Sequence, residues 1–141
     1  MLLGEKLWEG TGKTQTMTTK DTNPNGATIE YTWIAKLKGM GKAKTIDITI
    51  SFTGTKTADF FGAGPTTGEG VFFTKDGDLV AVKSSGYGKP QSGKGKSIEI
   101  WSFTATAQAL SWLNSTIAIV AIQGDDQWKQ FNLTINEWNT T

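Results

Sequence analysis

The chain has 141 residues, of which 37% are hydrophobic, and its 14 basic and 13 acidic residues leave a net charge of +1. It contains no histidine or cysteine, and every basic residue is lysine. The length and apolar content predict a single domain over residues 1–141. The missing residue types exclude a thiolate nucleophile, a Ser-His-Asp triad, a disulfide and ordinary zinc, copper or haem ligation, so we expect no metal and no cofactor.

The charge balance argues against two classes of partner. A net charge near zero provides no broad field to attract nucleic acid or an anionic membrane. The lack of arginine also removes the planar donor that recognises phosphate and guanine in two-point contacts. The start of the chain, MLLGEKLWEG, has too short an apolar run for a signal peptide. We therefore expect a cytoplasmic protein without nucleic-acid or membrane partners.

The first half of the chain shows the period-two alternation of strands with one buried face. A first strand is expected within residues 6–19, followed by a turn over residues 21–26. From Ala27 to Leu37 every odd position is apolar, and residues 46–52 repeat the pattern through three isoleucines and Phe52. The Gly39-Met40-Gly41 segment between these two runs predicts a hairpin.

The second half predicts five further strands. Residues 68–74 and 79–88 flank an Asp76-Gly77 pair, which is typical of a type I′ hairpin turn. Residues 97–106, 116–123 and 127–138 are rich in β-branched and aromatic residues, and residues 124–126 form a turn between the last two. Only residues 105–114 resemble a helix, and we expect one turn there.

About eight strands joined by short turns must hide their sheet edges, by closing into a barrel or by splitting into a sandwich. Long strands in sequential order favour an all-β, single-domain, antiparallel eight-stranded up-and-down barrel. Paired glycines in G-x-G spacing support it, since two glycines on one strand face let a sheet bend sharply. The alternative is that these glycines lie in flexible loops. The pairs are Gly62 and Gly64, Gly68 and Gly70, Gly86 and Gly88, and Gly93 and Gly95.

The stretch GYGKPQSGKGKS, residues 86–97, resembles a phosphate-binding loop only superficially. That motif requires G-x-x-x-x-G-K-[ST] before a helix. Gly95 stands where one reading frame needs a hydroxyl, and Pro90 stands where the other needs the first glycine. A strand follows instead of a helix. We expect a loop between two strands, with lysines that keep it soluble.

Carboxylates are the remaining candidates for chemistry. The Asp76–Asp78 and Asp125–Asp126 pairs are typical of turns rather than of calcium sites. Glu99 shares a strand face with Trp101 and Phe103, where burial would raise its pKa as acid or base catalysis requires. Ile98 and Ile100 offer a rival inward face, in which case Glu99 is solvated. The sequence leaves both orientations open.

Aromatic residues form the last candidate site. An eight-stranded barrel has an interior that side chains just fill or that holds one small ligand. The sequence does not distinguish a filled interior from a hollow one. The candidate ligand-binding residues are Tyr31, Trp33, Phe52, Phe72, Glu99, Trp101 and Phe103.

From about Gly64 to Trp138 the chain resembles a family of small uncharacterised prokaryotic proteins whose fold is similar to the allene oxide cyclase barrel. The resemblance implies a calycin-like barrel, often assembled into homo-oligomers, with no established activity. No motif transfers the catalytic residues of allene oxide cyclase to this chain. The segments that carry the resemblance are 68–70, 74–78, 86–88, 93–95, 113–114 and 137–138.

Three functions follow as hypotheses. The first is a non-enzymatic barrel that binds a small hydrophobic ligand inside. The second is an isomerase or cyclase that uses an interior carboxylate, either Glu99 or Glu30. The third is a carbohydrate-binding β-sandwich that presents Trp8, Trp128 and Trp138 on its surface, and it requires exposed coplanar rings.

Overall fold

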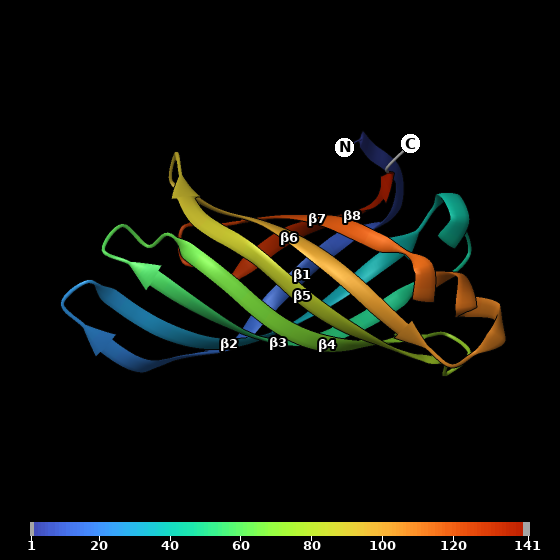
Figure 1. Ribbon diagram of the computed structural model, residues 1–141, viewed down its shortest axis with the longest axis horizontal. Helices are drawn as coiled ribbons and strands as arrows, with labels where there is room; N and C mark the ends of the chain where they lie inside the picture. The colour runs from blue at the N-terminus through green and yellow to red at the C-terminus, as the bar shows by residue number, and fades with distance from the viewer. Residues whose placement is uncertain (1, 140–141) are drawn as a thin grey trace.

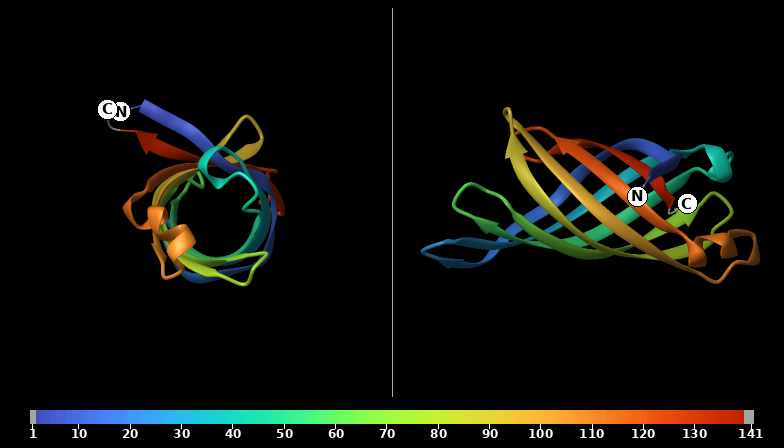
Figure 2. Two further views of the ribbon diagram at one scale, coloured as in Figure 1. Left: turned by 90° about the vertical axis from the view of Figure 1, so that its right-hand side faces the viewer. Right: turned by 45° about the horizontal axis from the view of Figure 1, so that its top comes forward.

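Eight antiparallel strands form one closed barrel in the computed structural model, which describes residues 2–139 (Figure 1). Each strand pairs with the next, and β8 pairs back with β1. An end-on view shows the resulting ring (Figure 2). The predicted up-and-down barrel is confirmed. Its strands are β1 (Leu2–Asn23), β2 (Gly26–Gly39), β3 (Ile48–Asp59), β4 (Gly64–Thr74), β5 (Leu79–Gln91), β6 (Lys94–Ala105), β7 (Ile117–Gly124) and β8 (Gln130–Asn139).

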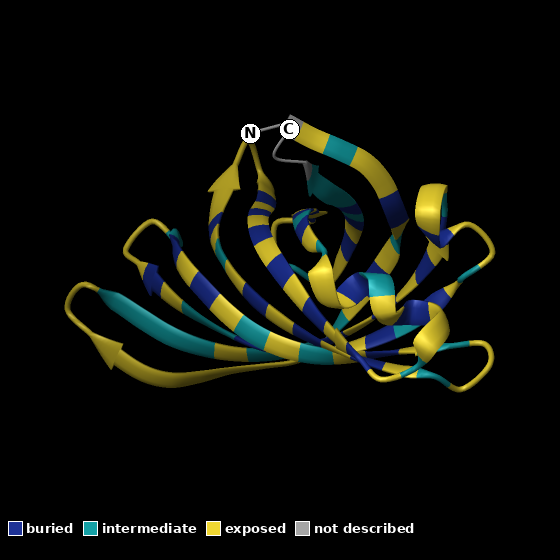
Figure 3. Cartoon of the chain, turned by 45° about the vertical axis from the view of Figure 1, so that its right-hand side comes forward, coloured by how far each residue is buried: buried dark blue, intermediate teal, exposed yellow. Residues whose placement is uncertain are grey.

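Alternating side chains explain the closure, because they give each strand one apolar face for the interior. Burial alternates strictly along β6, where every second residue from Gly95 to Ala105 is buried. The bands of buried and exposed residues repeat around the barrel (Figure 3). The core consists of these inward faces together with residues from the two short helices.

Several strands extend beyond the predicted bounds, and β1 and β3 show why. β1 continues to Asn23, where a turn was expected, and β3 continues from Phe52 to Asp59. The sequence pattern missed both extensions because they are rich in threonine and lack apolar alternation. Residues 15–23 of β1 are exposed on both faces, and pairing with β2 maintains them as a strand. This hairpin projects past the barrel wall (Figure 1).

The type I′ turn lies in a different hairpin from the one that the sequence predicted. Gly77 has a φ of 86° but Asp76 does not have a positive φ, so the β4–β5 connection is not the type I′ turn that was expected. The type I′ geometry occurs instead at the β5–β6 hairpin, where Ser92 and Gly93 both have positive φ, 54° and 75°. Residues 86–97 are thus two paired strand segments joined by a tight turn, so the strands extend further into this stretch than the loop expected from the sequence.

One end of the barrel is closed by two 3₁₀ helices, η1 (Gly41–Ala43) and η2 (Gln108–Ser115). The predicted single helical turn was too short, since η2 has eight residues. Leu110 and Leu113 of η2 are buried, and Trp112 stacks on the fully buried Trp8 at 6.3 Å. This packing stabilises a helix that would be too short to persist alone.

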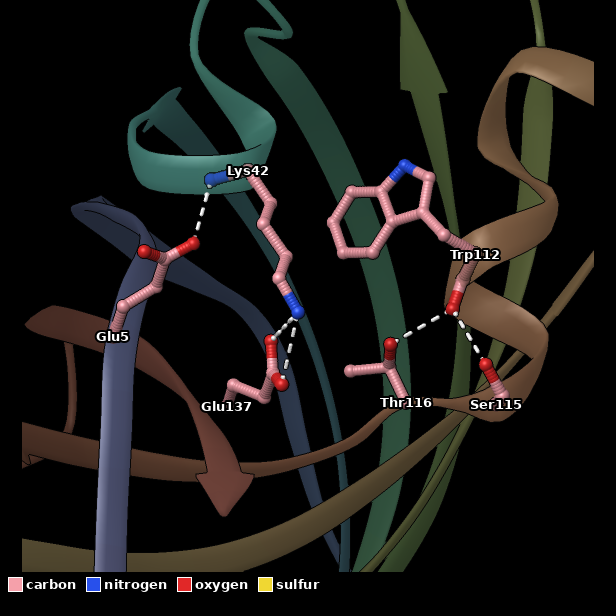
Figure 4. A network of polar contacts seen from close by, with 6 residues as sticks. All are labelled: Glu5, Lys42, Trp112, Ser115, Thr116 and Glu137. Carbon is pink, nitrogen blue, oxygen red and sulfur yellow. Dashed lines mark hydrogen bonds and ion pairs between the residues drawn. The ribbon is translucent and has the colours of Figure 1, made fainter.

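Polar contacts join η1 to the barrel and satisfy a carbonyl near the end of η2 (Figure 4). The Lys42 ammonium lies 2.8 Å from the Glu137 carboxylate, and the Lys42 amide donates to Glu5 Oε1 at 2.8 Å. The carbonyl of Trp112 accepts from the hydroxyls of Ser115 and Thr116. These contacts join η1 to β1 and β8 and terminate η2. The hairpin turns at the opposite end carry no such plug.

Within residues 2–139, no helix has the length and apolar character needed to cross a membrane.

Candidate ligand-binding site

A cavity of about 350 Å³ occupies the barrel interior at the end formed by the β1–β2, β3–β4, β5–β6 and β7–β8 turns. This volume lies at the lower end of the range for small-molecule sites. A larger hollow of about 760 Å³ beside it includes many exposed residues of β1 and β2. We take the smaller cavity as the candidate because buried polar groups line it. Its apolar lining includes Met17, Ile29, Trp33, Ala58, Pro90, Ile122, Trp128 and Phe131, and its polar lining includes Tyr31, Lys56, Thr66, Lys94, Ser97, Glu99 and Asp126.

Stacked aromatic rings form the floor of the cavity. Trp33 stacks on Phe52 with ring centroids 4.7 Å apart, and Phe52 stacks on Trp101 at 5.7 Å. Phe131 meets the face of Trp33 edge-on at 5.2 Å. Such aromatic pairs stabilise the fold by more than their buried area alone would. The floor is therefore a rigid apolar surface.

Glu99 points into the barrel and is 2% exposed, whereas Ile98 and Ile100 point outward. This resolves the two orientations that the sequence left open. Its Oε1 accepts hydrogen bonds from Trp101 Nε1 at 2.8 Å and from Ser84 Oγ at 2.9 Å. Its Oε2 accepts from Ser97 Oγ at 3.2 Å. These three donors offset part of the cost of burying a carboxylate, and Oε2 keeps capacity for another donor.

Tyr31 lines the cavity above this carboxylate. Burial, and to a lesser extent the negative charge of Glu99, raises the pKa of the Tyr31 hydroxyl well above its ordinary value of 10. The phenol therefore stays protonated at neutral pH and can donate a hydrogen bond. Its ring lies across Gly54, where a Cβ would overlap the ring tip.

Lys56 and Thr66 contribute polar groups from the wall formed by β3 and β4. Burial lowers the pKa of the Lys56 ammonium, and Asp59 opposes part of that effect. Thr66 is 4% exposed, and its Oγ1 has no hydrogen-bond partner among the described residues. A buried hydroxyl without a partner is uncommon, and it leaves Thr66 able to hydrogen-bond a bound molecule.

The glycines of residues 86–97 provide room for these side chains. Gly86 pairs directly with Glu99 across the β5–β6 ladder, and a Cβ there would lie 2.7 Å from Glu99 Cγ. Two residues along, a Cβ on Gly88 would lie 3.4 Å from Lys56 Nζ. Glu99 and Lys56 thus reach over neighbouring glycines of β5 from opposite sides. The glycine-rich stretch shapes the interior of the barrel, and it does so on strands rather than in flexible loops.

Trp128 lies at the cavity mouth in a backbone conformation that is rare for a large side chain, with a φ of 58°. Its ring covers Gly95 and Gly124, where added Cβ atoms would clash with it. The Thr14 hydroxyl donates to the Trp128 carbonyl. The Asp125 carboxylate accepts from three loop amides, and these hydrogen bonds, led by the one from Lys129, lower its pKa. The loop thus holds a tryptophan over the site.

All seven residues predicted to bind a ligand project into the barrel. Tyr31, Trp33 and Glu99 line the cavity. The other four lie deeper in the core, with Phe52 and Trp101 in the floor and Phe72 and Phe103 packed toward the plugged end. The interior is therefore filled at one end and hollow at the other. Whether these residues bind a ligand stays a prediction.

Sequence reasoning missed several polar residues of the cavity, among them Lys56, Thr66 and Ser97, and it considered Trp128 only as a surface residue of a sandwich. Lys56 lies in the polar half of β3, which had no strand pattern to assign it a face. The paired glycines were the available signal, because three of the four pairs include a glycine that faces a large side chain. Gly68 and Gly70 face Phe52, Gly86 and Gly88 face Glu99 and Lys56, and Gly95 faces Trp128.

The sandwich hypothesis is wrong, since the sheet closes into one barrel. Trp8 is fully buried and donates its Nε1 to the Ile46 carbonyl at 2.8 Å, so it cannot present a flat ring to a sugar. Glu30 is exposed, and its Oε2 lies 4.0 Å from Lys20 Nζ. Of the two glutamates considered for catalysis, only Glu99 is therefore interior.

Solved structures of other proteins share this fold. The chain resembles a β-barrel-like protein from Acinetobacter baumannii with a TM-score of 0.78 and 15% identity, over 96% of this chain and 94% of that one. It resembles a protein of unknown function from Clostridium acetobutylicum with a TM-score of 0.76 and 10% identity, over 94% of each chain. An enzyme from Penicillium herquei aligns with a TM-score of 0.70 and 16% identity, over 94% of this chain and 92% of that one.

No family model and no curated protein matches the chain. At these identities the structural matches show a shared barrel fold and nothing about chemistry. The resemblance to the allene oxide cyclase barrel therefore stays a prediction beyond the barrel itself.

Proposed function

We propose that the protein binds a small, largely apolar molecule inside the open end of the barrel. The observation that carries this proposal is the cavity of about 350 Å³, which combines a stacked aromatic floor with a few buried polar groups. Apolar walls with a small number of placed polar groups are the usual character of small-molecule sites. The unpartnered Thr66 hydroxyl adds support, since a bound molecule would satisfy it.

The cavity limits the size of the ligand. At about 30 Å³ for each non-hydrogen atom, the value for liquid water, it accommodates roughly a dozen such atoms. Its walls favour a flat or cyclic apolar body, because Trp33 and Phe131 present ring surfaces to it. A ligand that consists of one aromatic ring with a short side chain therefore matches both the size and the shape of the cavity.

Two measurements test this function. Native mass spectrometry of protein purified from its own host should show an added mass. Isothermal titration with phenylpropanol should show binding that Ile29→Trp abolishes by filling the cavity. The matched control is Ile117→Trp, which places the same change on the exposed outer face of β7. A bare mass together with no binding of the alcohol by the wild-type protein would contradict the proposal.

Proton transfer by Glu99 is a second candidate function. The observation that favours it is a carboxylate that is 2% exposed yet lines a cavity, with a free acceptor position on Oε2. A carboxylate so placed can remove a proton from a bound carbon acid. This would suit an isomerase or cyclase of small apolar substrates.

A generic carbon acid tests the second candidate. Nitrobenzisoxazole opens its ring when a base removes its carbon-bound proton, so it needs no knowledge of the natural substrate. If the protein opens the ring faster than buffer does, and Glu99→Gln loses this acceleration, an accessible base is supported. Equal rates for wild type and Glu99→Gln would remove this candidate and leave the binding proposal intact.

A further inference from the structure

One wall of the cavity gathers hydrogen-bond donors that the protein leaves without acceptors. Lys56 on β3 pairs directly with Thr66 on β4, and both line the cavity. Three ion pairs occur among the described residues, and Lys56 takes part in none of them. Thr66 Oγ1 is buried without a partner. The Lys56 ammonium and the Thr66 hydroxyl are therefore adjacent donors that are available to a ligand.

Tyr31 adds a third donor to the same wall. Ile29 pairs with Lys56 and Tyr31 pairs with Gly54, so Tyr31 and Lys56 are diagonal neighbours on the inner face. Diagonal neighbours in a sheet lie within reach of aromatic and long side chains. Because its pKa is raised, the Tyr31 phenol stays protonated and acts as a donor.

The nearby carboxylates do not neutralise Lys56. Asp59 lies three residues along β3, but its Oδ1 accepts from the amides of Phe61 and Ala63 in the β3–β4 turn. Glu99 lies on β6, where Ser84, Ser97 and Trp101 already donate to it. Lys56 leans over Gly88, so its ammonium faces the cavity rather than bulk solvent alone. The protein thus leaves a half-buried cation without a paired counterion.

We propose that Lys56, Thr66 and Tyr31 form a subsite for a carboxylate, so that the ligand is a small aromatic or cyclic carboxylic acid. This inference rests on the proposed function and specifies its ligand class. The acid group lies on the β2–β4 wall, and the apolar body lies against Trp33 and Phe131. Lys94 also lines the cavity but is exposed, so Lys56 is the half-buried cation there. One such cation balances one negative charge, which favours a carboxylate over a phosphate that carries about two.

Phenylpropionate and phenylpropanol test the proposal, because they share one apolar body and differ in the acid group. Isothermal titration at neutral pH should show that wild-type protein binds the acid at least about tenfold more tightly than the alcohol. A charge-assisted hydrogen bond in a partly buried site accounts for a preference of this size. Lys56→Met should lose that preference, because its binding of the acid should fall much more than its binding of the alcohol. Thr66→Val should weaken the binding of the acid several-fold.

Lys83→Met is the matched control, because Lys83 is exposed on the outer face of β5, and it should keep the preference for the acid. Thermal denaturation of each variant checks that the barrel is intact. Equal binding of acid and alcohol by wild type, or unchanged acid binding by a folded Lys56→Met, would overturn the carboxylate subsite while the binding function stands. If wild type binds neither probe, the proposed function fails, and the subsite fails with it.

Discussion

Gly86 faces Glu99 directly across the β5–β6 ladder, and the missing side chain of the glycine leaves the space that the carboxylate occupies. A methyl group at Gly86 would lie 2.7 Å from Glu99 Cγ and 2.8 Å from its Cα. The position of the one buried acid in the described core therefore depends on a residue thirteen positions earlier in the chain.

Gly86→Ala should destabilise the barrel and displace Glu99. The added methyl overlaps both backbone and side-chain atoms of β6, so the free energy of unfolding should fall by roughly 1–3 kcal/mol, the usual cost of overpacking. Urea denaturation measures this. Gly88→Ala is the control on the same strand face, since its methyl would meet the flexible Lys56 tip at 3.4 Å and the Lys96 carbonyl oxygen at 3.5 Å, which are ordinary van der Waals contacts. Equal losses for the two variants would contradict the special role of Gly86.

Glu99→Ala should lower the free energy of unfolding by roughly 1–3 kcal/mol, because it leaves buried donors without their acceptor. The largest effect is expected at the Trp101 indole, whose Nε1 donates to Glu99 at 2.8 Å. Loss of the shifted indole N–H resonance in the proton NMR spectrum would report it. Glu30→Ala, at an exposed site, should change stability by less than about 0.5 kcal/mol. A Glu99→Ala variant as stable as wild type would show that the three hydrogen bonds contribute little.

Tyr31 should make the fold sensitive to alkaline pH. Its pKa in the folded protein is raised above the ordinary value of 10, so the unfolded chain loses this proton first. The resulting stability is fully present below pH 10 and is lost as the pH rises, by at most about 1.4 kcal/mol per pH unit. Tyr31→Phe removes this titration. Urea denaturation at neutral pH and above pH 10 should show wild type losing more stability than the variant, and parallel losses would contradict this assignment.

Asp125 should control the loop that carries Trp128 at acid pH. Its pKa is lowered below the ordinary value of 3.8 by the amides that it accepts. The contribution of the ionised carboxylate is present above that value and is lost as the pH falls through the lower folded pKa. The amide resonances of Gln127, Lys129 and Gln130 should titrate together by NMR.

Asp125→Ala should abolish this shared titration and increase hydrogen exchange at the three amides. Asp126→Ala is the control, because it removes the adjacent carboxylate without touching these hydrogen bonds. Unchanged exchange in Asp125→Ala would show that the loop holds Trp128 by other contacts, such as the Thr14 hydroxyl.

The sequence by itself determined most of the strands and favoured a barrel over a sandwich, because strand alternation is a local property. Residues 27–37 and 97–106 alternate over short distances, and short turns between such runs allow few topologies other than an antiparallel meander. The missing histidine, cysteine and arginine likewise limited the chemistry before any contact was known.

Only the tertiary structure decided the cavity. The inward direction of Glu99 depends on the register between β5 and β6, and a shift of one residue would have turned Ile98 and Ile100 inward instead. The unpartnered Lys56 and Thr66 lie in polar stretches of β3 and β4. Pairing between these strands, rather than an alternating pattern in either, keeps them extended. A cavity is the space left by side chains from distant segments, so its polar wall and its size arise only when the barrel closes.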